Sequence, residues 1–527
     1  MRVPLFRFVA LVFSAVVIAG CSAPQTGEAG AQQALDDAAE AMGGWDALRA
    51  IQAQRIASEG SSWEPTQGIQ PGETRQVNSF SETMIADFGR SAVRIAFDGK
   101  RMYPAAGPLT FTEIIDGQNG ALEQADAAGL VSPVRLHPSR HATRLRDLNR
   151  LPARVLIAAS QAAGLDRVAD RTIDGTTYRV VTYRDAGQTA ELLIEVSTNL
   201  PARAAYMEDD PLLGDTRNEW VWSEWREVGG VRLPHTEERQ LNGLLIRRTT
   251  VSEVQNNPAI PANTFAIAAE VLQQPEVGER IASEWTLRRA AMGVGFQEFA
   301  RPQNVEIEMV APGVYHARGG GHHSMIVEMA DHLMVIEAPL FEERSRAVIN
   351  AIKERVPGKP IRYVMMTHHH NDHSGGIRAY AAEGATVIAH ASIVPFVQSV
   401  LTHPKTIRPD ALALVQAKAG SAANANVAID GVSARKEYTD GRRVVQVYPI
   451  PNEHAESMLA AYLPAERIIF VSDLYSPAPG GKVDPSNANA RAFYTAVTKL
   501  GLNVDRVVGG HGVVGRFRDL AAVMATS

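Results

Sequence analysis

Residues 367–376 read T-H-H-H-N-D-H-S-G-G and directly follow the apolar run 361–366. Their ligand-type side chains form the pattern H-x-H-x-D-H: His368, His370, Asp372 and His373. A packed core does not account for this pattern, because each buried imidazole would need a hydrogen-bond partner of its own. Residues two apart at the extended end of a strand point the same way, so His368 and His370 can bind one ion while His369 faces elsewhere. The stretch therefore predicts a strand with a metal site at its end.

The composition is that of an ordinary globular protein. The chain has 527 residues, of which 45% are hydrophobic and 21% are charged, so it is long enough for two or three hydrophobic cores. The formal net charge is -6, and no basic stripe is visible. A phosphate backbone would be repelled, which excludes a nucleic-acid partner and leaves a small molecule as the expected one.

The first twenty residues have the features of an export signal. Arg2 and Arg7 precede the apolar run 8–19, and Cys21 follows the small residues that end this run. The arrangement resembles a bacterial lipoprotein signal peptide over residues 1–20, with cleavage before Cys21.

Cys21 is the only cysteine of the chain, so it has no disulfide partner. The resemblance implies acyl chains on Cys21 that hold the protein in the membrane of the bacterial cell envelope. Ser22 at the next position favours the outer membrane, facing the periplasm. Residues 21–33 are small and polar and predict a flexible tether. A plain secretory signal, or a short membrane anchor with an incidental cysteine, stays open as the alternative.

Residues 34–262 are expected to form a β-rich antiparallel domain. Turn signals separate strand-like runs, and helices are expected at residues 35–50 and 144–163. The strand-like runs are 75–85, 91–97, 177–183, 190–196, 204–208, 219–225 and 244–251. A turn-rich linker near residue 260 predicts the end of this domain, followed by a connecting segment over 263–302 that contains a helix at 278–299.

The N-terminal region weakly resembles the curved half-barrel domains of periplasmic lipoprotein carriers. The likeness rests on the Gly-Gly-Trp-Asp-Ala-Leu opening at 43–48 and on the succession of strands after it. Strand alternation places Trp220 and Trp222 on one face of the sheet. These two rings either line a groove for an apolar ligand or pack in the core of the sheet, and the second reading is the simpler one.

Residues 303–527 show alternating strand and helix patterns, which indicate an α/β domain. Three further polar side chains follow apolar strands of this region: His454 after 444–450, Asp473 after 468–471, and His511 after 507–508. Each could be a satisfied structural residue by itself. Together with the opening cluster they complete a set of seven ligands.

The C-terminal region resembles the metallo-β-lactamase fold superfamily through residues 367–376, His454, the Ser-Asp pair at 472–473 and the G-G-H-G run at 509–512. The resemblance implies an αββα sandwich with a metal centre at one edge of its two sheets. It implies that one metal is bound by His368, His370 and His454, the other by Asp372, His373 and His511, with Asp473 between them.

Two divalent ions about 3.5–4 Å apart acidify a shared water, and the resulting hydroxide attacks an electrophilic carbon or phosphorus. Asp372 would orient this hydroxide and pass its proton to the leaving group. Histidine and carboxylate ligands suit two zinc ions, while iron or manganese stays open because no thiolate fixes the choice. With an aspartate at the bridging position, the predicted site resembles those of the glyoxalase II and lactonase branches of the superfamily.

The expected activity is hydrolysis of a lactone, ester, thioester or lactam. Two alternatives stay open: a β-lactamase of the same fold, and a carrier lipoprotein for an apolar ligand in which the metal domain is auxiliary. Candidate substrate residues are His322 and His323 in a glycine-rich loop and Tyr475 after Asp473. Solvated loop positions would explain the two histidines equally well, and packing would explain Tyr475.

Overall fold

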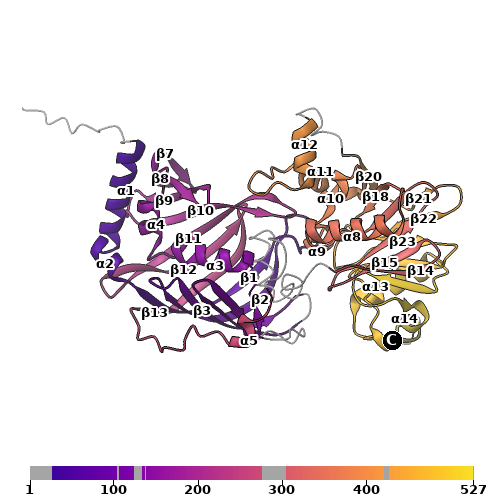
Figure 1. The fold of residues 1–527 in the computed structure, drawn as a ribbon, viewed down its shortest axis with the longest axis horizontal. Helices are drawn as coiled ribbons and strands as arrows, with labels where there is room; N and C mark the ends of the chain where they lie inside the picture. The colour runs from indigo at the N-terminus through magenta and orange to yellow at the C-terminus, as the bar shows by residue number, and fades with distance from the viewer. Residues whose placement is uncertain are drawn as a thin grey trace, which may run out of the picture.

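The computed structural model describes residues 26–103, 106–123, 133–136, 138–275, 304–419 and 427–525. They form an N-terminal domain (described residues up to 275) and a C-terminal domain (described residues from 304), which lie side by side in Figure 1. The predicted signal peptide, Cys21 and the predicted helix at 278–299 fall outside the described residues. Within the described ranges, no helix has the length and apolar character needed to cross a membrane.

The N-terminal domain is built on one 13-stranded antiparallel sheet, as predicted in kind. Its strands are β1 (Ala53–Glu64), β2 (Arg75–Asp87), β3 (Ala92–Arg101), β4 (Gly107–Asp116), β5 (Asn119–Leu122), β6 (Val134–Arg135), β7 (Asp166–Ile173), β8 (Thr176–Asp185), β9 (Gln188–Glu195), β10 (Pro201–Asp210), β11 (Gly214–Val228), β12 (Val231–Leu241) and β13 (Leu244–Asn256). Strand β1 pairs with both β2 and β13, so the first and the last strand of the domain are neighbours in the middle of the sheet.

Two-residue turns set the register of several hairpins. Asn242 and Gly243, between β12 and β13, have φ angles of 49° and 84°, and Asp174 and Gly175 have φ angles of 49° and 83°. Both pairs therefore occupy the left-handed conformation that a tight hairpin turn needs, and this is why Asn-Gly and Asp-Gly mark these turns in the sequence.

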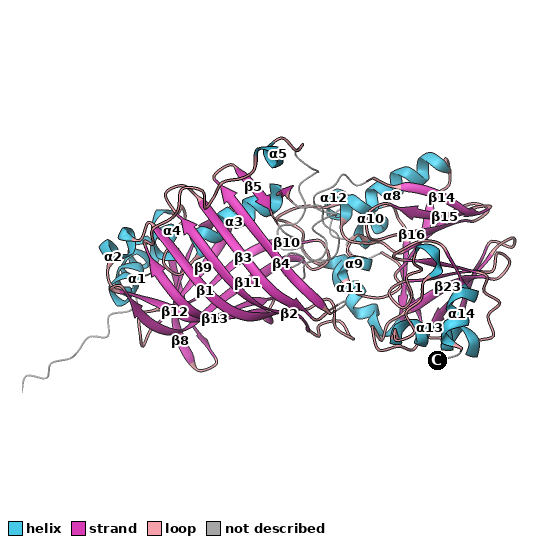
Figure 2. Ribbon diagram, turned by 90° about the horizontal axis from the view of Figure 1, so that it is seen from below, coloured by secondary structure: helices cyan, strands magenta, loops and turns pink. Residues whose placement is uncertain are grey.

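Four helices pack against this sheet: α1 (Gly27–Met42), α2 (Trp45–Ala50), α3 (Pro138–Arg150) and α4 (Val155–Gln161). Figure 2 shows the strands running past α3 and α4. Gly43 and Gly44 separate the first two helices, and a Cβ at Gly43 would lie 2.2 Å from the carbonyl oxygen of Gly230. Because α1 begins at Gly27, residues 27–33 are helical and not part of a flexible tether, which corrects the prediction for 21–33. Burial of Ala31, which is fully inaccessible to solvent, orders this turn.

The N-terminal domain also extends further along the chain than predicted. Phe265 is buried in a cluster with Ala92 and Ile114. After the short helix α5 (Ala269–Leu272), the side chain of Gln274 accepts a hydrogen bond from the amide of Arg135 at 2.9 Å. Residues 263–275 therefore belong to this domain and not to a connecting segment.

The C-terminal domain is an αββα sandwich, which confirms the predicted fold class. One sheet has seven strands: β14 (Glu306–Ala311), β15 (Val314–Arg318), β16 (Ser324–Glu328), β17 (Leu333–Ile336), β18 (Ile361–Met365), β19 (Thr386–His390) and β20 (Ile429–Val432). The other has six: β21 (Lys436–Thr439), β22 (Val444–Pro449), β23 (Leu459–Leu463), β24 (Ile468–Val471), β25 (Arg506–Gly509) and β26 (Gly515–Arg516). The helices are α8 (Glu342–Arg355), α9 (Asn371–Ser374), α10 (Ile377–Ala382), α11 (Val394–Thr402), α12 (Ala411–Ala419), α13 (Ala488–Lys499) and α14 (Phe517–Met524).

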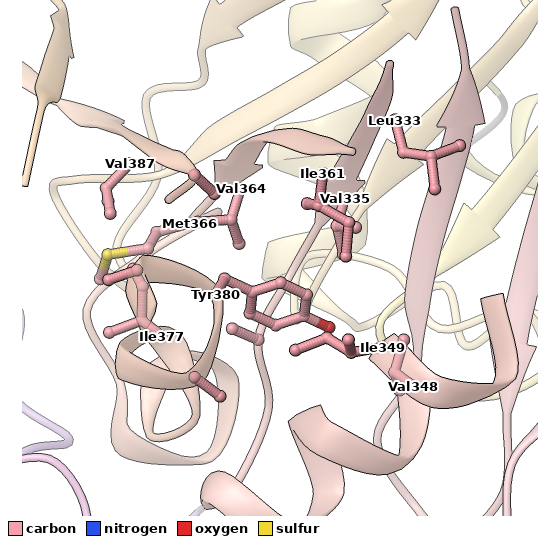
Figure 3. Packing of buried hydrophobic residues seen from close by; sticks show 14 of the residues in the cluster. Leu333, Val335, Val348, Ile349, Ile361, Val364, Met366, Ile377, Tyr380 and Val387 are labelled. Atoms are coloured by element: carbon pink, nitrogen blue, oxygen red, sulfur yellow. The ribbon is translucent and has the colours of Figure 1, made fainter. Parts of the chain in front are cut away.

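Three layers of apolar side chains hold the sandwich together. Residues such as Met325 and Phe470 fill the space between the two sheets. On one outer face, Tyr380 of α10 packs against Val335 and Ile349, as Figure 3 shows. On the other, Phe493 of α13 belongs to a cluster with residues of the second sheet. Strands β17, β18 and β19 are parallel, and so are β24 and β25, so each sheet presents several carboxyl ends at one edge.

A hairpin of the N-terminal domain anchors it to the C-terminal domain. Leu212, between β10 and β11, is fully buried in the core of the C-terminal domain. The carboxylate of Asp215 accepts hydrogen bonds from the amide and the hydroxyl of Thr406 at 2.9 and 2.6 Å. The ammonium group of Lys405 donates to the carbonyl oxygen of Asp210 at 2.6 Å. Apolar burial and polar contacts together fix the position of one domain against the other.

Candidate metal centre

The predicted metal ligands gather at the edge where the parallel strands end. His368 and His370 follow β18, and α9 carries Asp372 and His373 immediately afterwards. The other three follow strands of the second sheet: His454 after β22, Asp473 after β24 and His511 after β25. The amide of Leu459 donates to the carbonyl oxygen of Thr367 at 2.7 Å, so the two sheets meet at this edge.

The first group of ligands consists of His368, His370, His454 and Asp473. One ligand atom from each residue lies within 4.8 Å of the others. The Oδ2 atom of Asp473 is 3.0 Å from Nε2 of His454 and 3.8 Å from Nε2 of His368. The three histidines are almost completely buried, so this group is a compact set of three imidazoles and a carboxylate.

A second group combines His322, His373 and His511 within the same distance limit. The other oxygen of Asp473, Oδ1, is 2.9 Å from Nε2 of His373 and 3.1 Å from Nε2 of His511. The Oδ2 atom of Asp372 lies 3.7 Å from Nε2 of His373 and 3.4 Å from Nε2 of His322. Asp473 thus faces one group with each oxygen, and His322, predicted as a substrate residue, lies among the ligand-type side chains.

The residues fit divalent metal ions. Among the described residues, Nε2 of His368 and Nδ1 of His370 are buried without a hydrogen-bond partner, and Nε2 of His373 and of His454 make no well-oriented hydrogen bond. Buried polar atoms are normally satisfied, and an unsatisfied one costs about 1–3 kcal/mol. Four such nitrogens aimed at two small regions are explained by ions that bind them.

In four of the histidines, the opposite ring nitrogen has a partner that sets the orientation of the ring. Nδ1 of His368 is 3.0 Å from the hydroxyl of Thr367, and Nδ1 of His373 is 3.0 Å from the hydroxyl of Ser472. Nε2 of His370 is 2.9 Å from the carbonyl oxygen of Gly68, and Nδ1 of His511 is 2.5 Å from that of Gly321. A carbonyl oxygen only accepts, so the nitrogen facing it carries the proton and the other nitrogen is free to bind metal.

Burial and charge act differently on the pKa values of the two groups of histidines. Burial lowers the pKa of His368 and of His370 well below its usual value, which keeps both rings neutral. Burial would also lower the pKa of His373, but the carboxylates of Asp473, Glu337 and Asp372 raise it well above its usual value. This excess of negative charge around one imidazole is what a bound divalent cation would neutralise.

Other candidates lie away from the two groups. Nδ1 of His369 is 3.1 Å from the hydroxyl of Ser457, in agreement with a ring that faces elsewhere. The ring of His323 meets that of His316 edge to face at 4.8 Å between centroids, and burial lowers the pKa of His323 to about 3. Tyr475 is 5% exposed and belongs to the hydrophobic core beside α13. Packing contacts account for the positions of His323 and Tyr475, and a contact of either residue with substrate stays a prediction.

Sequence reasoning missed three residues at the site. Glu337 follows β17, is fully buried at a φ of 73°, and accepts a hydrogen bond from Thr367 at 2.5 Å. Its position after an apolar strand was the signal that could have identified it. Gln67 and Gly68 come from the loop between β1 and β2, where nothing in the local sequence indicates a metal site.

Comparison with known proteins gives a family match for the C-terminal part. Residues 317–511 match the family described as the metallo-beta-lactamase superfamily. A curated relative, 2,4-dinitroanisole O-demethylase subunit alpha of Nocardioides sp. (strain JS1661), is 23% identical over 207 residues, which are 39% of this chain and 56% of the relative. This chain therefore matches little more than half the length of that relative.

Two solved structures are similar to the same part of the chain. A metallo-beta-lactamase from Pontibacter korlensis is 17% identical, with a TM-score of 0.31, and the match covers 42% of this chain and 98% of that protein. The stereoselective inverting sec-alkylsulfatase Pisa1 from Pseudomonas sp. is 18% identical, also with a TM-score of 0.31, and the match covers 42% of this chain and 40% of that protein.

Proposed function

Residues 317–511 form a metallo-β-lactamase superfamily domain, as the sequence predicted, and from this premise we propose that the protein is a lipid-anchored hydrolase that uses two metal ions. The observation that carries the proposal is the position of Asp473. Its two oxygens face two separate groups of histidines at 2.9–3.1 Å. A carboxylate in this position can connect two ions, whereas a site for one ion would not need the second group.

The ligands proposed are those that the family resemblance implies. His368, His370 and His454 would hold one ion, and Asp372, His373 and His511 the other, with Asp473 between them. Two divalent ions bound by these residues would lower the pKa of a bound water molecule toward neutrality and so supply the nucleophile. The Oδ2 atom of Asp372, which lies within 4 Å of both His322 and His373, is placed to orient that water and to receive its proton.

The substrate class proposed is a lactone, ester, thioester or lactam, each of which offers an electrophilic carbonyl carbon to the water. A β-lactamase activity lies within this class. Because the curated relative is named for 2,4-dinitroanisole, this aryl methyl ether belongs in the substrate panel as well.

Zinc is the proposed metal for both positions. Imidazole nitrogens and carboxylate oxygens are its ordinary ligands in proteins, and the same donors also accept iron or manganese. The only cysteine is Cys21, so a thiolate ligand plays no part in the choice. Elemental analysis of protein purified without added metal identifies the ion, and about two equivalents of zinc per chain are expected.

The decisive experiment measures hydrolysis by the zinc-loaded full-length protein. Lactones, β-lactams, aryl esters, thioesters, phosphodiesters and 2,4-dinitroanisole form the panel, and Asp372→Ala and a chelated sample are the comparison. We expect turnover of at least one carbonyl substrate that is lost in both comparison samples. Protein that binds no metal, or activity that survives chelation, would contradict the proposal.

We also propose that acyl chains on Cys21 hold the protein in the outer membrane, facing the periplasm, since Cys21 directly follows the signal-like residues 1–20. The test is fractionation of cells that produce the wild type or Cys21→Ser. The wild type should sediment with the outer membrane and the variant should not. A variant that stays in the membrane fraction would contradict acylation as the anchor.

A cavity in the N-terminal domain favours carrier function as a second candidate. It has a volume of about 140 Å³ and is lined both by apolar side chains such as Ile95 and Leu148 and by charged ones such as Glu237 and Arg239, with Arg239 over the ring of Trp220 at 4.2 Å. The buried faces of Trp220 and Trp222 otherwise belong to the core of the sheet, as the simpler reading expected. The test is binding of an apolar fluorescent probe to metal-free protein. Binding to the wild type that is lost in Leu148→Trp, where the larger side chain fills the cavity, would favour this candidate over the hydrolase.

A further inference from the structure

The loop between β1 and β2, residues 65–74, reaches from the N-terminal domain into the metal centre. Pro65 to Gly68 are buried in it. The carbonyl oxygen of Ile69 accepts a hydrogen bond from the amide of Glu456 at 3.0 Å, two residues beyond the ligand His454. The ring of Tyr103, at the end of the neighbouring strand β3, stacks on the ring of His454 at 6.1 Å. The N-terminal domain therefore contacts the segments that carry the ligands at several points.

Gln67 contacts the carboxylate that faces the second group. Its side chain is 1% exposed, and Nε2 donates to Oδ1 of Asp372 at 2.5 Å and to Oδ1 of Asn371 at 2.9 Å. An amide nitrogen has two hydrogens, so both donors are used within the protein. Gln67 is thus a positioning residue, because it occupies one oxygen of Asp372 and leaves Oδ2 directed at the second group.

Gly68 contacts a ligand of the first group. Its carbonyl oxygen faces Nε2 of His370, so the proton of that ring lies on Nε2 and the unpartnered Nδ1 is presented to the metal. Glycine is required at this position because a Cβ would lie 2.5 Å from the carbonyl oxygen of Glu73 and 2.6 Å from its Cβ atom. The turn of the loop is therefore too tight for a side chain at the residue that holds His370.

Hydrogen bonds at both ends of the loop fix its conformation. The carboxylate of Glu64 accepts hydrogen bonds from the amide and the hydroxyl of Thr66 at 3.2 and 2.7 Å. At the other end, the carboxylate of Glu73 accepts a hydrogen bond from the amide of Gln70 at 3.1 Å. These contacts, together with the anchor at Leu212, hold the loop at a fixed distance from the centre.

We propose that the β1–β2 loop of the N-terminal domain is a structural part of the metal centre, in which Gln67 positions Asp372 for the second ion and Gly68 positions His370 for the first. The inference rests on the proposed two-metal site. It gives the N-terminal domain a role in the chemistry that does not depend on any ligand of its own. Removal of a residue that hydrogen-bonds to a metal ligand typically lowers metal affinity by about 10- to 100-fold.

The test measures zinc affinity of the full-length protein by competition with a chromophoric chelator. Gln67→Met removes both donors at similar size and should weaken the second equivalent of zinc by about 10- to 100-fold with the first retained. Gly68→Ala displaces the carbonyl group and should weaken the first equivalent. Gln70→Met, at an exposed glutamine of the same loop, is the matched control and should bind as the wild type does.

Two further measurements separate positioning from folding. Cobalt-substituted protein should show altered visible absorption bands in Gln67→Met and in Gly68→Ala but not in the control, because these bands report ligand geometry. The unfolding temperature of the metal-free variants shows whether each one folds. Wild-type protein without two tightly bound ions would overturn the proposed function itself, whereas two ions bound with unchanged affinity and spectra in both variants would overturn only this inference.

Discussion

The carboxylate of Asp473 lies 3.0 Å from Nε2 of His454 through one oxygen and faces His373 and His511 through the other. Burial alone would raise the pKa of Asp473, but the neighbouring imidazoles, His373 above all, hold it well below its usual range. The residue therefore stays ionised and joins the two groups into one centre.

Asp473→Asn should lower the bound zinc from about two equivalents to about one and reduce turnover by about 100-fold, because the amide removes the charge that connects the two ions. Elemental analysis and steady-state kinetics measure the two effects. Asp505→Asn is the control, since this carboxylate is partly exposed and pairs with Arg516 outside the centre. Full zinc content in Asp473→Asn would refute the connecting role.

His322→Ala should weaken the second ion selectively. The ligand atoms of His322, His373 and His511 lie within 4.8 Å of one another, so His322 is placed to bind or orient the second ion. A roughly 10-fold loss of affinity for the second equivalent is expected from chelator competition. The control is His332→Gln. His332 precedes β17, at the end of that strand away from the metal centre, so this variant should leave both equivalents unchanged. Equal zinc binding by the two variants would return His322 to the substrate role that the sequence suggested.

The candidate ligands could be predicted from the sequence because each one follows an apolar strand. Parallel strands bring their carboxyl ends to one edge, so His368, Asp473 and His511 meet although more than a hundred residues separate the first from the other two. The same reasoning, applied to the strand that ends at Ile336, would have added Glu337. The local sequence pattern was sufficient to predict a site residue wherever that residue directly follows a strand, because the end of the strand determines where the residue lies.

The contributions of the N-terminal domain could not be predicted in this way. Gly68 and His370 are 302 positions apart and belong to different domains, so their contact depends on how the domains dock. Strand β1, which leads into the loop, was also missed because its sequence is polar and carries glycine and serine in place of clear alternation. Docking depends in turn on the tip of the hairpin between β10 and β11, where Leu212 is buried in the C-terminal core and Leu213 packs against it.

Leu212→Ala should loosen the docking of the two domains. The side chain is fully buried in the C-terminal core, and truncation of such a leucine costs about 2–5 kcal/mol. We expect faster proteolysis between the domains and a larger radius of gyration in small-angle scattering. Leu414→Ala removes the same atoms from a side chain that is 54% exposed and should change neither quantity. A compact, protease-resistant Leu212→Ala protein would show that the other contacts are sufficient.

The last prediction concerns the acid stability of the N-terminal domain. Glu113 is fully buried, which by itself would raise its pKa, but Arg140 and Arg144 lower the pKa to about 2. Since the usual value of 4.5 applies to the unfolded chain, the ion pairs stabilise the fold fully above pH 4.5, and this stabilisation is lost as the pH falls toward 2.

Five of the six tryptophans lie in this domain, between positions 45 and 225, and residues 304–527 contain none, so tryptophan fluorescence reports urea unfolding of this domain. In the chelated full-length protein, Glu113→Gln should cost about 3–5 kcal/mol at pH 6, because it leaves two arginines without their carboxylate, and the difference from the wild type should shrink below pH 4. Glu59→Gln, at an exposed position of the same sheet, is the control and should unfold as the wild type does at both pH values. A difference between Glu113→Gln and the wild type that stays constant from pH 6 to pH 3 would mean that the carboxyl of Glu113 is not the group that titrates.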